Sequence, residues 1–190
     1  RILEARDDVT VIRHPENRGY GRALAEGFAW AAANDVNCVI TMDCDGQHEP
    51  RHIPEFIAAL EDGSDIISGS RYLPGSASTG VAPPERQRVN REVTAFVNEL
   101  TGWGITDAFC GFKAYRMSAL RELHLHEPGY AMPLELWVRA YVAGLNVREI
   151  PVERIYCDRD RSFGAGLDDA QDRIAYYRRV WSETLAEVGL

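Results

Sequence analysis

Two carboxylates at the end of a short apolar run have a spacing that suggests a metal site. The run Val39–Met42 is followed by Asp43, Asp45 and Gln47, with Gly46 before the glutamine. Side chains at alternate positions of an extended chain point to opposite faces, so a tight turn at Gly46 is needed to gather them around one ion. Oxygen ligands favour Mg²⁺ or Mn²⁺, whose shell a bound diphosphate commonly completes. An acidic turn in which an Asp caps a helix is the alternative.

Alternating strand and helix patterns surround this acidic turn. Apolar periodicity predicts strands at 9–12, 37–42 and 65–69, and helices at 17–33 and from Pro50 to about residue 60. This order is typical of an α/β domain with a mainly parallel sheet flanked by helices. Ligands bind such sheets at the carboxyl ends of the strands, where Asp43 and Asp45 lie.

The rest of the chain continues as one domain covering residues 1–190. Residues 73–84 are rich in Pro, Gly and Ser, which predicts an exposed and mobile loop. Beyond this loop, the patterns predict helices at 85–101, at 133–143 and from Asp168, and strands at 109–115 and 147–156. A chain of 190 residues with 45% hydrophobic composition can bury one substantial core.

The overall charge and the cysteines limit the possible partners and compartments. The formal net charge of -8 argues against a nucleic-acid-binding protein, which would usually carry a basic face. Four cysteines without zinc-type spacing favour a reducing compartment. No apolar run approaches the roughly 20 residues that span a bilayer. We therefore expect a cytoplasmic protein whose membrane contact, if it has one, is peripheral.

Six motifs follow one another in the order seen in one enzyme family. They are Asn17-Arg18-Gly19-Tyr20-Gly21, Met42–His48, Gly69-Ser70-Arg71-Tyr72, Asp107–Phe112, Glu149-Ile150-Pro151-Val152 and Arg161-Ser162-Phe163-Gly164. From Val9 to Gly166 the chain resembles glycosyltransferase family 2, and within it the dolichyl- or polyprenyl-phosphate mannosyltransferase-like branch. The resemblance implies a GT-A, Rossmann-like fold and inverting transfer from a GDP- or UDP-sugar whose diphosphate binds Mg²⁺ or Mn²⁺.

The resemblance also implies roles for individual residues. Asp43, Asp45 and Gln47 would hold the metal ion. Residues 73–84 would cover the acceptor. Arg71 would contact phosphate of the donor or acceptor and would also stabilise the leaving group. Three further arginines would contact phosphate as well: Arg86, Arg88 and Arg161.

Two departures from the family pattern affect these expectations. Gly166 and Leu167 replace the serine and lysine that follow Arg161-x-x-Gly164 in the prenyl-phosphate branch. The first two strands of the family, including the aspartate that meets the nucleotide, have no counterpart here. We therefore expect an N-terminally truncated fold in which Val9–Ile12 lacks its sheet neighbour.

The need for a general base depends on the acceptor. A phosphate is already a nucleophile, whereas a hydroxyl must give its proton to a carboxylate. Asp107, which precedes Cys110-Gly111-Phe112, is the candidate base, with bonding to backbone amides at a turn as its alternative role. Glu135 is a weaker candidate for the base than Asp107, because it opens a predicted helix, where a carboxylate complements the helix dipole. His48 and His52 are expected to support the metal ligands or lie on the surface.

We expect a metal-dependent, inverting hexosyltransferase of cell-envelope synthesis that uses a polyprenyl phosphate at the inner face of the membrane. The alternatives are transfer to a hydroxyl in polysaccharide or glycolipid synthesis, and a non-catalytic domain that binds nucleotide sugars. An Asp-x-Asp phosphatase is a further alternative, although Gln47 stands where its motif expects threonine. The sequence leaves the oligomeric state open.

Overall fold

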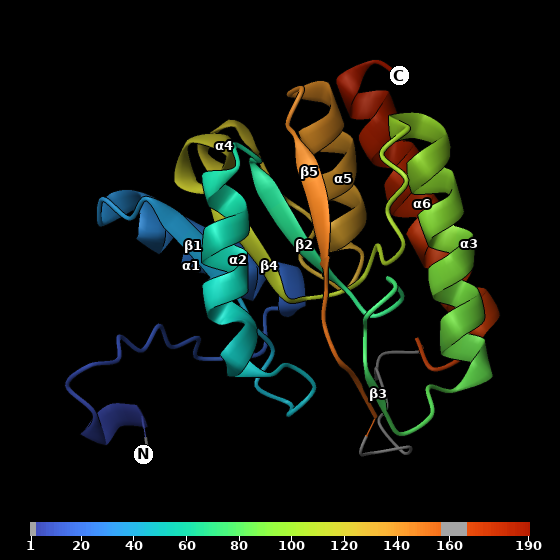
Figure 1. The fold of residues 1–190 in the computed structure, drawn as a ribbon. Helices are drawn as coiled ribbons and strands as arrows, with labels where there is room; N and C mark the ends of the chain where they lie inside the picture. Colours follow the sequence, from blue (N-terminus) through green and yellow to red (C-terminus); the bar gives the residue numbers. More distant parts are fainter. Residues whose placement is uncertain (1–2, 157–166) are drawn as a thin grey trace.

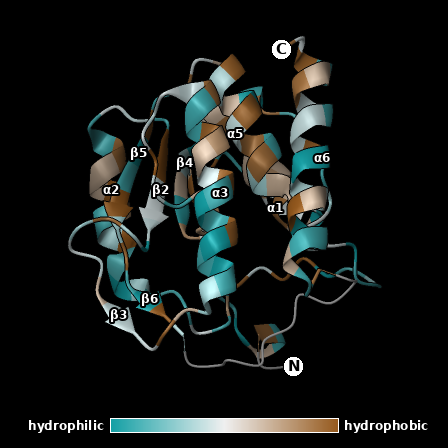
Figure 2. Cartoon of the chain, turned by 90° about the vertical axis from the view of Figure 1, so that its right-hand side faces the viewer, coloured by the Kyte–Doolittle hydropathy of each residue, from teal (hydrophilic) through white to brown (hydrophobic). Residues whose placement is uncertain are grey.

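The computed structural model describes residues 3–156 and 167–190, which form a sheet between two layers of helices (Figures 1 and 2). The strands are, in spatial order, β1 (Cys38–Thr41), β4 (Lys113–Arg116), β2 (Ile66–Ser70) and β5 (Val147–Pro151). β2 and β5 pair in parallel, whereas β4 pairs antiparallel with both β1 and β2. The sheet is therefore mixed, with β1, β2 and β5 running in one direction.

Helices cover both faces of the sheet. They are α1 (Tyr20–Ala33), α2 (Ile53–Glu61), α3 (Pro84–Thr101), α4 (Met117–Glu122), α5 (Met132–Val142) and α6 (Ala170–Val188), with 3-10 turns η1 (Leu3–Ala5) and η2 (Pro50–His52). Figure 2 shows α2 on one side of the sheet and α1, α3, α5 and α6 on the other. Neighbouring strand residues alternate between the two sides, since Ile66 joins the larger core and Ile67 packs against α2.

The larger core surrounds α5, which is buried on most of its circumference. A helix that is buried on most sides needs several neighbours, and α5 receives them from α6, α3 and α1. Trp137 at its centre is fully buried. Burial of each large apolar side chain contributes roughly 1.5 to 3 kcal/mol, so α5 fixes the helices that border the site.

The prediction of a strand at residues 9–12 is wrong. Val9, Val11 and Ile12 lie in irregular structure with exposed fractions of 37%, 40% and 46%. A strand needs a hydrogen-bonded neighbour, and no described segment pairs with these residues. The apolar pattern alone could not supply that neighbour.

The strand predicted at 147–156 consists of two shorter strands, β5 and β6 (Arg154–Ile155). The pairing of β5 with β2 extends to Ser70 and Pro151, and the next residue, Val152, still donates its N–H to the Ser70 carbonyl at 2.9 Å. The strand predicted at 109–115 begins only at Lys113, and the short helix α4 was not predicted.

The loop predicted at residues 73–84 contains the short strand β3 (Ser78–Thr79), which pairs in parallel with β6. The Arg154 N–H donates to the Ala77 carbonyl at 2.9 Å, and the Tyr156 N–H donates to the Thr79 carbonyl at 2.8 Å. This ribbon ties the loop to the segment after β5. Within the described part of the chain, no helix combines the length and apolarity needed to cross a membrane.

Candidate active site

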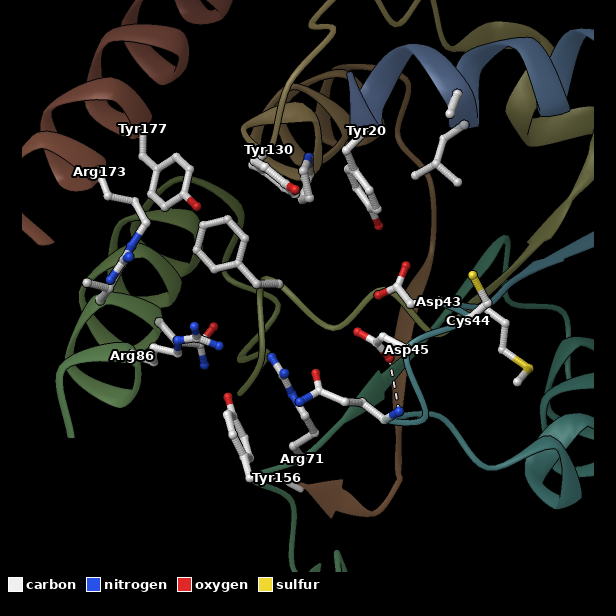
Figure 3. A pocket seen from close by; sticks show the side chains of 18 of the residues that line it. Tyr20, Asp43, Cys44, Asp45, Arg71, Arg86, Tyr130, Tyr156, Arg173 and Tyr177 are labelled. Atoms are coloured by element: carbon white, nitrogen blue, oxygen red, sulfur yellow. Dashed lines mark hydrogen bonds between the residues drawn. The ribbon is translucent and has the colours of Figure 1, made fainter. Parts of the chain in front are cut away.

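A cavity of about 470 Å³ lies beyond the carboxyl ends of β1 and β2 (Figure 3). Asp43 and Asp45 follow β1, and Arg71 follows β2. Arg86 on α3 and Arg173 on α6 complete the charged part of the wall. The parallel course of β1 and β2 brings residues 43–45 and 71 to one edge of the sheet, as expected for ligand binding in α/β proteins.

The acidic turn after β1 is tight at Gly46, as its sequence predicts. Gly46 adopts a φ of 78°, in the left-handed region that other residues rarely enter. The Asp45 carboxylate accepts a hydrogen bond from the Gln47 N–H at 2.9 Å, which tightens the turn. Both aspartates project toward the cavity in Figure 3, and Gln47 lines it.

Asp43 is held by its surroundings. Its N–H donates to His48 Nδ1 at 2.9 Å, so a neutral His48 carries its proton on Nε2, which lies 4.0 Å from Asp43 Oδ2. Burial lowers the pKa of His48, whose ring stacks on Phe112 at 5.2 Å. Gly111 borders the other side, where a Cβ atom would lie 2.6 Å from Asp43 Oδ2. The absence of a side chain at Gly111 therefore makes room for this carboxylate.

The acidic turn fits a divalent ion that is shared with a bound ligand. Among the described residues, no three His, Cys, Asp or Glu side chains converge closely enough to hold a metal ion by themselves. Two carboxylates suit Mg²⁺ or Mn²⁺ provided that ligand oxygens or water complete the shell. His52 does not contribute to the cavity wall, since its Nδ1 pairs with Glu55 at 3.0 Å.

Arg71 is clamped by Asp107. Asp107 Oδ2 accepts from Arg71 Nε at 2.6 Å and from its backbone N–H at 3.2 Å, while Oδ1 accepts from Nη2 at 2.9 Å. Burial by itself raises the pKa of Asp107, but the charge and hydrogen bonds of Arg71 outweigh burial and hold that pKa below its usual value. The same pairing raises the pKa of Arg71 against the effect of burial.

This placement does not fit the general base predicted at Asp107. The residue is fully buried, does not line the cavity and holds a strongly paired carboxylate. Glu135 is also outside the wall, because its Oε2 accepts from the N–H groups of His126 and Glu127 at 2.8 and 2.7 Å. Both carboxylates instead fix neighbouring segments.

The predicted phosphate-binding arginines separate into groups. Arg71 and Arg86 line the same cavity. Arg88 is exposed and does not line it, because it lies on another side of α3. Arg161 lies outside the described residues. Arg173, which the sequence reasoning missed, is buried and donates to Glu85 Oε1 and to the Leu167 carbonyl, both at 2.8 Å.

Aromatic side chains form much of the remaining wall and were not predicted as site residues. They are Tyr20, Tyr72, Phe109, Tyr130, Tyr156 and Tyr177. The rings of Tyr20 and Tyr130 stack with centroids 5.7 Å apart. One signal for the missed Arg173 was available, since it precedes Tyr177 by four residues and so shares the apolar stripe of the last helix.

Comparison with known proteins identifies the family. Residues 1–124 match the family model described as Glycosyl transferase family 2. The chain belongs to glycosyl transferase family 2. It is 31% identical over 176 residues to a polyprenol monophosphomannose synthase of Mycolicibacterium smegmatis, covering 89% of this chain and 65% of that protein. It is 27% identical to an undecaprenyl-phosphate mannosyltransferase of Micrococcus luteus, covering 76% and 60%. The chain thus spans less than two thirds of either relative.

Solved structures support the GT-A fold of this family 2 chain. Glucosyl-3-phosphoglycerate synthase from Mycobacterium tuberculosis, solved in complex with Mn²⁺, UDP-glucose and phosphoglyceric acid, superposes with a TM-score of 0.62 at 20% identity. The match covers 95% of this chain and 57% of that one. The predicted fold and family are confirmed, and family membership replaces the alternative of an Asp-x-Asp phosphatase.

Proposed function

We propose that the protein is a metal-dependent, inverting glycosyltransferase that moves a sugar from a GDP- or UDP-sugar to a polyprenyl phosphate. One observation carries the proposal: a single cavity is lined by Asp43 and Asp45 together with Arg71, Arg86 and Arg173. Carboxylates attract a cation with its diphosphate, and guanidinium groups suit phosphate oxygens. The names of the mannosyltransferase relatives agree with this assignment.

The acceptor follows from the acids of the cavity. Of the described residues that line it, only Asp43 and Asp45 carry carboxylates, and both belong to the acidic turn assigned to the donor. A hydroxyl acceptor would need a further base, whereas a phosphate acceptor needs none. The cavity therefore favours a phosphate over a hydroxyl. Because a polyprenyl phosphate is a lipid, we also propose that the protein works in contact with the inner face of the membrane.

The side chains of this chain divide the work of the reaction. Asp43, Asp45 and Gln47 would hold Mg²⁺ or Mn²⁺, which when bound neutralises charge on the departing diphosphate. Arg71 donates toward phosphate through the guanidinium nitrogen that Asp107 leaves unused, Nη1. Arg86 and Arg173 orient the acceptor phosphate for in-line attack on the anomeric carbon. Losing one such donor commonly lowers the rate about a hundredfold to a thousandfold.

Calorimetric titration of GDP- and UDP-sugars, with and without Mn²⁺, tests the donor site. The protein is compared with Asp45→Asn, and Asp62→Asn serves as the matched control because its carboxylate pairs with Arg148 on the surface at 2.5 Å. We expect Mn²⁺-dependent binding that falls about tenfold to a hundredfold in Asp45→Asn and stays unchanged in Asp62→Asn. Equal, metal-independent binding by all three would contradict the site assignment.

Transfer is tested with a radiolabelled donor and undecaprenyl phosphate in detergent micelles. A labelled lipid product is expected. Metal-dependent donor binding without any transfer would favour the non-catalytic domain, and transfer only to a hydroxyl acceptor would refute the phosphate acceptor.

A further inference from the structure

The alignment of Arg71 depends on residues that do not reach the cavity. We propose that Glu149, on β5, is a positioning residue that holds Arg71 in place through Thr106 and Asp107. The proposal rests on the phosphate-binding role of Arg71 proposed above. Glu149 does not line the cavity, and its effect must therefore pass through the residues that it binds.

The Glu149 carboxylate gathers three donors from one turn. Oε2 accepts from the N–H and the hydroxyl of Thr106 at 2.7 and 2.8 Å, and Oε1 accepts from the Asp107 N–H at 3.0 Å. Asp107 in turn binds Arg71 through its backbone N–H, Nε and Nη2. One carboxylate on β5 therefore fixes the turn that carries the clamp of Arg71.

A second branch of the network reaches the backbone on either side of Arg71. An ionised carboxylate only accepts, so the Thr106 hydroxyl must donate to Glu149, and the Ser70 hydroxyl must then donate to Thr106 Oγ1 at 2.5 Å. Ser70 Oγ accepts from the Tyr72 N–H at 3.1 Å. This directed chain of hydrogen bonds begins one residue after Arg71, passes through the residue before it, and ends at Glu149.

The electrostatic cost of keeping the Glu149 carboxylate close to Asp107 supports a role for Glu149 beyond ordinary packing. Burial and the nearby charge of Asp107 raise the pKa of Glu149, although its hydrogen bonds to Thr106 and Asp107 oppose the shift. Two carboxylates kept close together in a largely buried place are unfavourable unless donors satisfy both. The three donors that satisfy Glu149 come from residues 106 and 107, on the turn that carries the clamp of Arg71.

Glu149→Gln changes this network without a large change in shape. The amide of glutamine must turn its NH₂ toward either Thr106 or Asp107, where it meets a backbone N–H instead of accepting from it. Thr106→Val is a second, milder variant, because it keeps both backbone bonds and interrupts only the hydroxyl chain to Ser70. Arg148→Gln, one residue away on β5, is the matched control, since it breaks only the exposed pair with Asp62.

A double-mutant cycle with Arg71→Lys measures whether Glu149 acts through Arg71. We expect Glu149→Gln to lower kcat/KM about tenfold to a hundredfold in the parent and less than about twofold in the Arg71→Lys background. The effect should be smaller there because lysine lacks the planar guanidinium group that Asp107 binds through two nitrogens. Thr106→Val should follow in the same direction, and Arg148→Gln should change little in either background. An equal loss in both backgrounds would overturn the proposal.

An NMR measurement keeps the test independent of catalysis. The Arg71 Nε–H signal of protein labelled with ¹⁵N-arginine is assigned by its loss in Arg71→Lys. We expect this signal to shift and exchange faster with solvent in Glu149→Gln and to stay unchanged in Arg148→Gln. A shifted signal in protein that shows no transfer would leave the positioning role standing and refute the proposed function. An unchanged signal in folded Glu149→Gln would refute the positioning role.

Discussion

We expect Asp107→Asn to lower the free energy of unfolding by about 3 to 5 kcal/mol, because it leaves Arg71 without its counter-charge in a buried place. The Asp107 side chain is fully buried, and the Arg71 side chain is only 17% exposed. Solvent therefore screens this pair weakly. The substitution removes one charge while it keeps nearly the same shape, so packing changes contribute little.

The contacts of Asp107 support that magnitude. Its two oxygens accept from Arg71 N, Nε and Nη2 and from the Phe109 N–H at 3.3 Å. Asparagine keeps one accepting oxygen and turns its NH₂ toward at least one of these donors. Each hydrogen bond to a charged group is worth about 1.5 to 3 kcal/mol, so losing one or two matches the expected range. For a chain of this size, the change corresponds to a drop in Tm of about 6 to 20 °C.

Urea unfolding followed by far-UV circular dichroism measures the change. Asp62→Asn is the control, because its exposed ion pair with Arg148 is expected to contribute less than about 1 kcal/mol. A loss below about 1 kcal/mol in Asp107→Asn would refute the reasoning, since the carboxylate would then not be holding a buried charge.

The pH dependence gives a second check on the same pair. The folded-state pKa of Asp107 lies below its usual value, so the ionised carboxylate stabilises the protein above the unfolded-state pKa of about 3.9. This contribution is lost as the pH falls from about 4 through the lower folded-state pKa. The stability difference between the parent and Asp107→Asn should therefore shrink in that window and stay constant from pH 5 to 7. A difference that grew on acidification would contradict the assignment.

Two further substitutions test the cavity. Gly111→Ala places a Cβ atom 2.6 Å from Asp43 Oδ2, so we expect Mn²⁺-dependent donor affinity, measured by calorimetry, to fall about a hundredfold. Gly27→Ala is its control, because a Cβ there meets nothing within 4 Å. Unchanged affinity in Gly111→Ala would show that Asp43 does not need the space beside Gly111. Arg86→Ala should raise the KM for polyprenyl phosphate about tenfold to a hundredfold in a transfer assay, whereas the exposed Arg88→Ala should not. Equal effects of the two arginines would argue against an acceptor site on this face of α3.

Local patterns predicted most of the regular structure because each relied on its own periodicity or turn chemistry. The acidic turn is an example, since Gly46 after a strand is enough to predict the left-handed φ that the structure has. The strand at residues 9–12 failed because a strand depends on a partner that periodicity cannot supply. The sequence also did not predict that β4 runs antiparallel to its neighbours, since a short apolar run has the same pattern in either direction.

The sequence by itself determined the family, the α/β alternation and the position of Asp43 and Asp45 at a strand end, because these features depend on residues close together in the chain. Only the tertiary structure decided the roles of distant residues. Asp107, 36 positions after Arg71, became its buried partner instead of an exposed base, and Arg173 reached the cavity from the last helix. Burial and pairing are properties of the whole fold, so they decide the role of a side chain whose local sequence is compatible with more than one role.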